Sequence, residues 1–262
     1  MAGANRRKYS FDADTYLKTR FSDVNVRGRI LFPLESFHDA FQSLPSSLRV
    51  LDYGAGPVIM SVISAARSAS EIVLSDHAES SLETLRKWLR KDATAFDWSP
   101  YFDHVVQTLE GKGEQEARER EERLREIVKD VAYCDIEEDP PIRTTCPGPY
   151  DVVIDSGTLT ASSRTKEMFV RGVAKVAGLL KPGGTLLSFT SDRRMDGDLV
   201  GTYYIGSEQH SVLNTSSEYF VSVLEQQGFC DISVKRFPVD ETVKEFYDPQ
   251  LVGFKFITAR KI

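Results

Sequence analysis

The chain has 262 residues, of which 41% are hydrophobic and 27% are charged, a composition typical of a folded globular protein and not of a disordered one. Its 33 basic and 39 acidic side chains give a net charge of −6, which argues against a general nucleic-acid-binding protein and against a polybasic protein of the membrane surface. The length fits a single domain over residues 1–262. We expect a monomer whose partner is a small molecule.

The cysteines indicate the compartment. Cys134, Cys146 and Cys230 are odd in number and have neither metal-ligand nor redox spacing. We therefore expect free thiols, no bound metal and a cytoplasmic protein. No stretch of the sequence approaches the roughly 18 continuous apolar residues that a membrane span needs.

Short apolar runs alternate along the chain with longer segments of helical spacing, a pattern typical of repeated βαβ units around a parallel sheet. The sequence therefore predicts an α/β fold. The expected strands are 48–52, 71–75, 150–155, 184–190, 232–237 and 253–259. Because no long helix separates the last two strands, we expect the sheet to end antiparallel, with residues 238–250 forming a loop at one sheet end.

Helices are expected between these strands. Residues 58–66 continue from a glycine-containing turn with a helical pattern, and residues 80–91 place leucines on one face and basic side chains on the other. Residues 110–130 are rich in Glu, Arg and Lys, and an apolar stripe at helical spacing predicts a solvated helix with one buried face. That stripe consists of Leu124, Ile127, Val128 and Val131.

The first expected strand ends in the string VLDYGAGP, in which Gly54 and Gly56 permit a tight turn that brings backbone N–H groups close to a ligand. On its own, a Gly-x-Gly turn is equally consistent with a purely structural turn. Asp76, however, ends the second strand twenty positions after Gly56, the spacing at which nucleotide-binding sheets place a carboxylate on the ribose hydroxyls.

Two departures from the dinucleotide-binding pattern narrow the class of ligand that the turn can bind. Ile59 stands where that pattern has its third glycine, and Asp52 adds an acid before the turn. Both features disfavour the binding of a bulky pyrophosphate at this turn. The pair Asp52 and Asp76 instead indicates a nucleoside that carries a cationic amino acid, a description that S-adenosylmethionine fits.

The string VLDYGAGP, Asp76 and the LKPGG turn at 180–184 resemble the motifs of class I S-adenosylmethionine-dependent methyltransferases. More narrowly, the chain resembles the family of nicotinamide, phenylethanolamine and indolethylamine N-methyltransferases. The segments that carry this narrower resemblance are AFDWSP at 95–100, EGKG at 110–113, CDI at 134–136, and Tyr203 and Tyr204 with Gly206 and Glu208.

The resemblance runs from about Tyr16 to the end of the chain. It implies a Rossmann-like class I methyltransferase fold, in which a mostly parallel seven-stranded sheet has an antiparallel last strand and helices on both faces. Within the single domain, residues 1–45 would form lid helices, and residues 46–262 would form the catalytic core with its substrate-side insertions.

The resemblance also implies S-adenosyl-L-methionine as cofactor, with a role for each matching residue. Tyr16 would cover the carboxylate of the cofactor, Gly54 and Gly56 would lie against its methionine portion, and Ser156 would lie close to its amino-acid end. Asp76 and Ser81 would face the ribose. Asp135 and Ile136 would face the adenine. Asp135 is also consistent with a helix or turn cap.

On the substrate side, Tyr203 and Tyr204 are expected to form the pocket wall, because aromatic faces stabilise the cation that methylation of a neutral nitrogen produces. Tyr204 is also a candidate catalytic residue. Gly201 and Leu213 replace two serines that help anchor the carboxamide in the nicotinamide enzymes.

Two acids are candidates for binding an amine and taking its proton. Asp248 falls within one residue of an amine-binding acid of the phenylethanolamine enzymes, and Glu245 lies nearby in the sequence. Asp248 is expected to contact the substrate, and both acids are candidate catalytic groups.

Together these observations predict an S-adenosylmethionine-dependent N-methyltransferase that acts on a small amine or ring nitrogen by in-line methyl transfer, with an amine favoured over nicotinamide. Three alternatives stay open: a nicotinamide N-methyltransferase proper, a non-catalytic relative that binds S-adenosylmethionine and regulates a partner, and an NAD-dependent oxidoreductase. The last shares the strand, the glycine turn and the distal acid.

Overall fold

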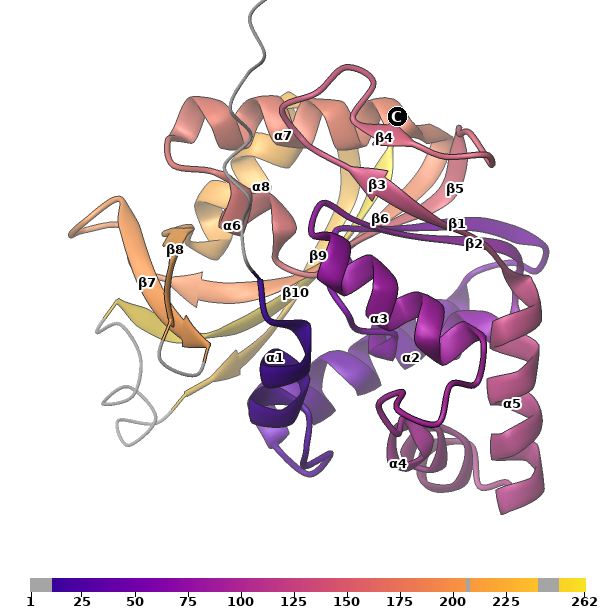
Figure 1. The fold of residues 1–262 in the computed structure, drawn as a ribbon. Helices are drawn as coiled ribbons and strands as arrows, with labels where there is room; N and C mark the ends of the chain where they lie inside the picture. Colours follow the sequence, from indigo (N-terminus) through magenta and orange to yellow (C-terminus); the bar gives the residue numbers. More distant parts are fainter. Residues whose placement is uncertain (1–10, 206–207, 240–249) are drawn as a thin grey trace, which may run out of the picture.

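The computed structural model describes residues 11–205, 208–239 and 250–262. Within these ranges an eight-stranded sheet separates two layers of helices, and a two-stranded hairpin stands apart from the sheet (Figure 1). No helix in the described part of the chain has the length and apolar character to cross a bilayer.

The strand order of the sheet is β4-β3-β2-β1-β5-β6-β10-β9. The strands are β1 (Leu48–Tyr53), β2 (Ala69–Asp76), β3 (Val128–Cys134), β4 (Ile142–Arg143), β5 (Tyr150–Asp155), β6 (Leu180–Arg193), β9 (Phe229–Pro238) and β10 (Leu251–Lys261). β3, β2, β1, β5 and β6 are parallel, whereas β10 runs antiparallel to both of its neighbours. The expected antiparallel last strand is confirmed, and the two-residue β4 raises the strand count from the expected seven to eight.

Side chains alternate between the two faces of each strand, and each face is apolar. On β1, Val50 belongs to one core cluster and Leu51 to the other. The helices that cover the first face are α2 (Phe32–Ser43), α3 (Glu79–Leu89), α4 (Ser99–Asp103) and α5 (Glu114–Ile127), and those that cover the second are α6 (Thr158–Ser162), α7 (Lys166–Leu179) and α8 (Ser217–Gln226) (Figure 1). The predicted α/β class with helices on both faces is therefore confirmed.

Two expected helices differ from the structure. α5 ends at Ile127, and Val128 and Val131 belong to β3, where they pair with Ile72 and Leu74 of β2. A spacing of three fits a helix and not the period of two of a regular strand, but an irregularity in the pairing between Ile72 and Val73 of β2 lets both valines of β3 pack on the same face. In place of the expected helix at 58–66, the chain forms two short 3-10 turns, Met60–Val62 and Ser64–Arg67.

The hairpin of β7 (Val200–Ile205) and β8 (Glu208–Leu213) was not expected from the sequence pattern. α1 (Ala13–Arg20) lies against β7, and a π-helical turn, Arg27–Leu31, leads into α2. α1 falls within residues 1–45, for which lid helices stay a prediction.

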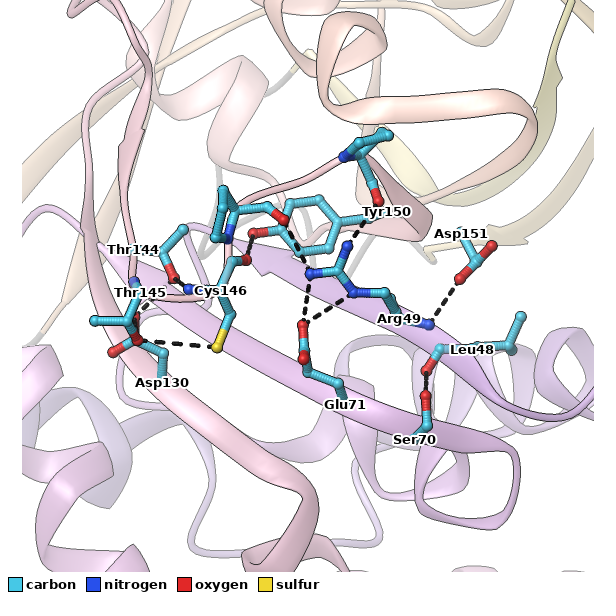
Figure 2. Close-up of polar contacts among 12 residues, drawn as sticks. Leu48, Arg49, Ser70, Glu71, Asp130, Thr144, Thr145, Cys146, Tyr150 and Asp151 are labelled. Atoms are coloured by element: carbon cyan, nitrogen blue, oxygen red, sulfur yellow. Dashed lines mark hydrogen bonds and ion pairs between the residues drawn. The ribbon is translucent and has the colours of Figure 1, made fainter.

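At the amino ends of the strands, Arg49 of β1 binds both Glu71 of β2 and the loop before β5 (Figure 2). Its guanidinium binds Glu71 Oε1 through Nε at 3.1 Å and Nη2 at 2.8 Å, and donates to the carbonyl oxygens of Pro147 at 2.9 Å and Pro149 at 3.2 Å. The Arg49 backbone N–H donates to Asp151 at 2.8 Å. These contacts fix the amino edge of the sheet, opposite the edge where the glycine turn lies.

Candidate active site

A cleft of about 280 Å³ opens at the carboxyl edge of the sheet, between α1 and the β7–β8 hairpin. Residues from both halves of the chain line it. They include Tyr16, Arg20 and Arg29 near the N-terminus, Gly54 to Pro57 after β1, Ser156 to Thr158 after β5, Phe189 to Ser191 and Arg193 on β6, Tyr203, Ile205 and Val212 on the hairpin, and Leu251 and Phe254 on β10. Carboxyl edges of open parallel sheets are where such folds bind ligands.

The glycine turn has the backbone that the sequence predicts. Gly54 has φ of +74° and Gly56 has φ of +63°, in the left-handed region that favours glycine. A Cβ at Gly54 would overlap the side chain of Thr158, whose hydroxyl donates to the Gly54 carbonyl at 2.8 Å. A Cβ at Gly56 would meet nothing within 4 Å. Gly54 therefore allows close packing against α6, whereas the space beside Gly56 stays open.

Asp76, at the end of β2, is joined to this turn. Its Oδ2 accepts from the Gly56 N–H at 3.0 Å, and its Oδ1 accepts from the Ala78 N–H at 2.8 Å. Burial raises the pKa of Asp76, and the two backbone hydrogen bonds oppose that rise. The Oγ of Ser81, on α3, is buried and has no hydrogen-bond partner among the described residues.

Asp52 lies beneath the turn and does not line the cleft. Its side chain is fully buried on the Val50 face of β1, where Oδ2 accepts from the Ser61 hydroxyl. Burial raises the pKa of Asp52 to about 7. These contacts tie the end of β1 to the Met60–Val62 turn, and neither Asp52 nor Asp76 is among the residues that line the cleft.

The other expected cofactor residues divide into two groups. Tyr16 and Ser156 line the cleft, and burial raises the pKa of Tyr16 to about 12, so its phenol is neutral. Asp135 and Ile136 follow β3 outside the cleft lining. Asp135 accepts from the Glu137 N–H at 2.9 Å, which is a local turn contact, and Ile136 packs against the core of the second face.

The structure separates the two tyrosines of β7. Tyr203 lines the cleft and stacks on His210 of β8, with ring centroids 5.3 Å apart. Tyr204 is 49% exposed and outside the lining, because successive residues of a strand point to opposite faces. Its backbone carbonyl accepts from Arg20. Of the two tyrosines expected to form the pocket wall, Tyr203 lines the cleft and Tyr204 does not, while Glu245 and Asp248 lie outside the described residues.

Sequence reasoning missed several cleft residues. Phe189 of β6 and Phe254 of β10 stack with centroids 5.8 Å apart, and Arg193 ends β6 on the same face as Phe189. Period-two alternation continued past the expected strand end at residue 190 would have placed Arg193 beside Phe189. Arg29 lies in a short helical turn that carries no such signal.

Known proteins resemble this chain over its whole length. A family model described as the NNMT/PNMT/TEMT family matches residues 1–262. Nicotinamide N-methyltransferase of Homo sapiens is 34% identical over 216 residues, which cover 81% of this chain and 76% of that protein. Indolethylamine N-methyltransferase of Mus musculus is 28% identical, covering 99% and 96% respectively.

Among solved structures, the Burkholderia thailandensis 1,6-didemethyltoxoflavin-N1-methyltransferase, with bound 1,6-didemethyltoxoflavin and S-adenosylhomocysteine, is similar. It matches with a TM-score of 0.51 and 15% identity, covering 95% of this chain and 84% of that one. At this identity the likeness shows the fold alone.

Proposed function

Because the chain belongs to the NNMT/PNMT/TEMT family of S-adenosylmethionine-dependent N-methyltransferases, we propose that its cleft transfers a methyl group to a small amine or a ring nitrogen. One observation carries this proposal. A single continuous cleft joins Gly56, Tyr16 and Ser156, the residues expected around the methionine portion of the cofactor, to the aromatic ring of Tyr203. Family membership also removes the oxidoreductase alternative.

The residues around the glycine turn fit the cofactor. The space beside Gly56 is open, Asp76 lies against the turn, and the buried Ser81 hydroxyl has an unused hydrogen-bonding capacity. We assign the ribose of the cofactor to Asp76 and Ser81. We assign its methionine portion to Gly54, Gly56 and Ser156, with the neutral phenol of Tyr16 beside the methionine carboxylate. Asp135 and Ile136 stay the candidates for adenine, and Asp52 supports the turn from below.

When bound, S-adenosyl-L-methionine supplies an already activated methyl group, so the protein has little covalent chemistry to perform. Its residues act by position. Holding the acceptor nitrogen in line with the methyl group in a water-poor cleft can supply up to ~7–11 kcal/mol of the barrier reduction. The ring of Tyr203 faces the cleft, where it can stabilise the cation that forms on nitrogen by about 0.5–2 kcal/mol.

The nature of the acceptor decides whether a base is needed. An aliphatic amine arrives protonated, so we propose that Asp248 or Glu245 takes the proton before attack, whereas a ring nitrogen of the pyridine type needs no base. Gly201 and Leu213 form part of the hairpin and supply no side-chain hydrogen bond for a carboxamide. This supports an acceptor other than nicotinamide.

The remaining proposals concern partners and compartment. The three free thiols support a reducing compartment, and we propose the cytoplasm. The acidic net charge supports an enzyme with no nucleic-acid partner, and we propose that it acts as a monomer.

Incubation of the full chain with a labelled methyl donor and a panel of amines, pyridines and thioethers tests the function. We expect labelled product with at least one nitrogen acceptor. Retained binding of S-adenosylmethionine with no transfer across the whole panel would contradict the proposal and favour the non-catalytic, regulatory alternative.

A further inference from the structure

Two threonine hydroxyls from different elements meet in the wall of the cleft. Thr160 on α6 and Thr190 on β6 both line it, and their Oγ1 atoms are 3.0 Å apart. The two residues are 1% and 5% exposed, respectively, so bulk water does not compete for this contact. A hydrogen bond between two hydroxyls has a fixed direction when one of the two protons is used elsewhere.

The proton of Thr160 is used by the backbone. Thr160 Oγ1 donates to the Gly157 carbonyl oxygen at 3.0 Å. A hydroxyl has one proton, so Thr160 can only accept in its contact with Thr190. If Thr160 instead donated to Thr190, the contact with Gly157 would contain no proton and one of the two hydrogen bonds would be lost. The arrangement that makes both bonds is therefore a relay, in which Thr190 donates to Thr160 and Thr160 donates to Gly157.

This direction leaves Thr190 as a hydrogen-bond acceptor. Its single proton points to Thr160, so its oxygen keeps only lone pairs for another partner. Among the described residues, Thr160 is the sole hydrogen-bond partner of the Thr190 hydroxyl. The hydroxyl lies toward Gly157, another lining residue, where a Cβ built on the glycine would be 3.8 Å from Thr190 Oγ1. The cleft therefore has an unused acceptor at this point of its wall.

Thr158, a third threonine of the wall, has a different role. Its Oγ1 donates to the Gly54 carbonyl at 2.8 Å, and a Cβ built on Gly54 would overlap its side chain. The Thr158 hydroxyl therefore faces the glycine turn and joins α6 to it. This makes Thr158 a matched control for Thr190, because both are threonines of the same cleft whose protons are used within the protein.

An oxygen that presents only lone pairs selects for hydrogen-bond donors. It binds an N–H group and repels the lone pair of an ether, a carbonyl or a tertiary amine. During methylation the nitrogen lone pair forms the new bond to the methyl carbon, the carbon–sulfur bond breaks with its electrons on sulfur, and an N–H on the nitrogen stays in place. That N–H becomes a stronger donor as positive charge develops on nitrogen, so its hydrogen bond strengthens in the transition state.

Resting on the proposed methyl transfer, we propose that Thr190 selects an acceptor whose methylatable nitrogen carries an N–H, through a hydrogen bond from that N–H to Thr190 Oγ1. Thr160 is a positioning residue, because it fixes the direction of the Thr190 proton. The acceptor class is thereby narrowed from small nitrogen compounds to primary and secondary amines, and tertiary amines and pyridine-type nitrogens are disfavoured.

Uncharged compounds of similar shape test this inference without a contribution from the charged groups of the cleft. Indoline carries an N–H, dihydrobenzofuran has an ether oxygen in its place, and N-methylindoline is a tertiary amine. Binding of the first two to the full chain saturated with S-adenosylhomocysteine is measured by calorimetry at neutral pH, and we expect indoline to bind about three- to tenfold more tightly. With S-adenosylmethionine, kcat/KM for indoline should exceed that for N-methylindoline by about tenfold or more.

Variants of Thr190 assign the preference to its hydroxyl. Thr190→Val keeps the shape of the side chain and leaves Thr160 its bond to Gly157, so no buried donor is left unpaired and the fold should be retained. It is expected to weaken indoline binding by about three- to tenfold, with unchanged affinity for dihydrobenzofuran and for S-adenosylhomocysteine. Thr190→Ser should keep the wild-type preference. The control Thr158→Val should also keep it, even where cofactor binding weakens.

Thr160→Val tests the direction of the proton. Without its acceptor on Thr160, the Thr190 hydroxyl is free to turn its proton to the cleft and to donate. Dihydrobenzofuran should then gain affinity by about three- to tenfold, so that the preference disappears with no loss of indoline affinity. A role of Thr160 in packing alone would not produce this gain. Thr160→Ser keeps the relay and should behave as the wild type does.

The possible results separate this inference from the proposed function. An unchanged preference in Thr190→Val overturns the role of Thr190, whether or not that variant loses affinity for S-adenosylhomocysteine. Absence of indoline binding to the wild type, or tighter binding of dihydrobenzofuran, overturns it too. No gain of dihydrobenzofuran affinity in Thr160→Val overturns the direction of the relay. A preference that depends on Thr190, with no methyl transfer to any acceptor, would support the inference and contradict the proposed function.

Discussion

The carboxylate of Asp76 accepts a hydrogen bond from the backbone N–H of Gly56 at 3.0 Å, so the end of β2 and the turn after β1 form one hydrogen-bonded unit. The two residues are twenty positions apart in the sequence. This side chain holds the turn in shape, and it is the residue that we propose for the ribose.

Replacing Asp76 tests that position. Asp76→Ala should weaken binding of S-adenosylhomocysteine by about 1–3 kcal/mol, because it leaves hydrogen-bonding partners unpaired. Asp76→Asn keeps an acceptor for the Gly56 N–H and should lose less. Calorimetric titration gives both affinities, and thermal unfolding shows whether the fold is retained. An affinity unchanged by Asp76→Ala would remove the ribose assignment.

The two glycines of the turn provide a matched pair. Alanine at either position adopts a positive φ, at a cost of about 1–2 kcal/mol. Only Gly54→Ala also overlaps Thr158, which should add about 1–3 kcal/mol of strain. Urea denaturation should therefore show a larger loss of stability for Gly54→Ala than for Gly56→Ala. Equal losses would mean that the packing of Gly54 against α6 is not tight.

The buried carboxyl of Asp52 predicts a pH dependence. Its pKa rises from an ordinary value near 4 to about 7 on folding, so its protonated form is favoured in the folded chain. The stability that it contributes is present below pH 4 and is lost as pH rises through about 7. Asp155, whose pKa burial raises to about 6, acts in the same direction.

Asp52→Asn keeps the shape of the protonated acid but cannot ionise. It should match the wild type in stability only below about pH 4, and its advantage over the wild type should grow between pH 5 and pH 8 by an amount on the order of 1–3 kcal/mol. Denaturant unfolding at both pH values measures the difference in stability between the two proteins. Asp155 is present in both, so its own pH dependence cancels in the comparison. A difference that does not grow with pH would show that Asp52 is already ionised at pH 5.

The β7 tyrosines should differ in function. Tyr203→Ala removes a ring from the cleft and should lower kcat/KM by about 2- to 30-fold, the equivalent of a cation–π contact of about 0.5–2 kcal/mol. Tyr204→Ala removes an exposed ring and should change kcat/KM by less than about twofold, because the Tyr204 carbonyl that binds Arg20 is retained. Steady-state kinetics on the two variants with one acceptor compares them, and a larger effect at Tyr204 would reverse the assignment.

The proton-handling proposal is tested by the choice of acceptor. Asp248→Asn should impair methylation of an aliphatic amine at neutral pH much more than methylation of a pyridine, which has no proton to lose. Glu245→Gln is the comparison variant, and the acid whose loss is selective for amines is the base. Equal losses for amine and pyridine would exclude Asp248 from that role.

Much of the sheet could be predicted from the sequence, because its strands are short apolar runs bounded by turn residues. The six expected strands all lie within observed ones, and the antiparallel end follows from the short separation of β9 and β10. β3 was missed because Val128 and Val131 have the spacing of a helix, and only their pairing with β2, which contains an irregularity, places them in a strand. The hairpin was missed because its strands have no apolar alternation.

The candidate site could be predicted in part. Gly54, Gly56, Tyr16, Ser156 and Tyr203 do meet at one cleft, because strand ends and turn residues mark positions along a sheet edge. Turn residues do not show whether a side chain near that edge points into the cleft or into the core. Asp52 fits an acidic binding residue by its place in the sequence, but the alternation of β1 directs it into the core.

The hydrogen bond from Arg20 to the Tyr204 carbonyl joins the first helix to a hairpin 184 positions further along the chain, across the mouth of the cleft. Truncation up to residue 20 would therefore delete Tyr16 and, at the same time, release the hairpin that carries Tyr203. A shortened protein without activity would not reveal which of these losses was responsible. Point replacements at the two ends of this bridge, studied singly and together, would separate cofactor retention from acceptor positioning.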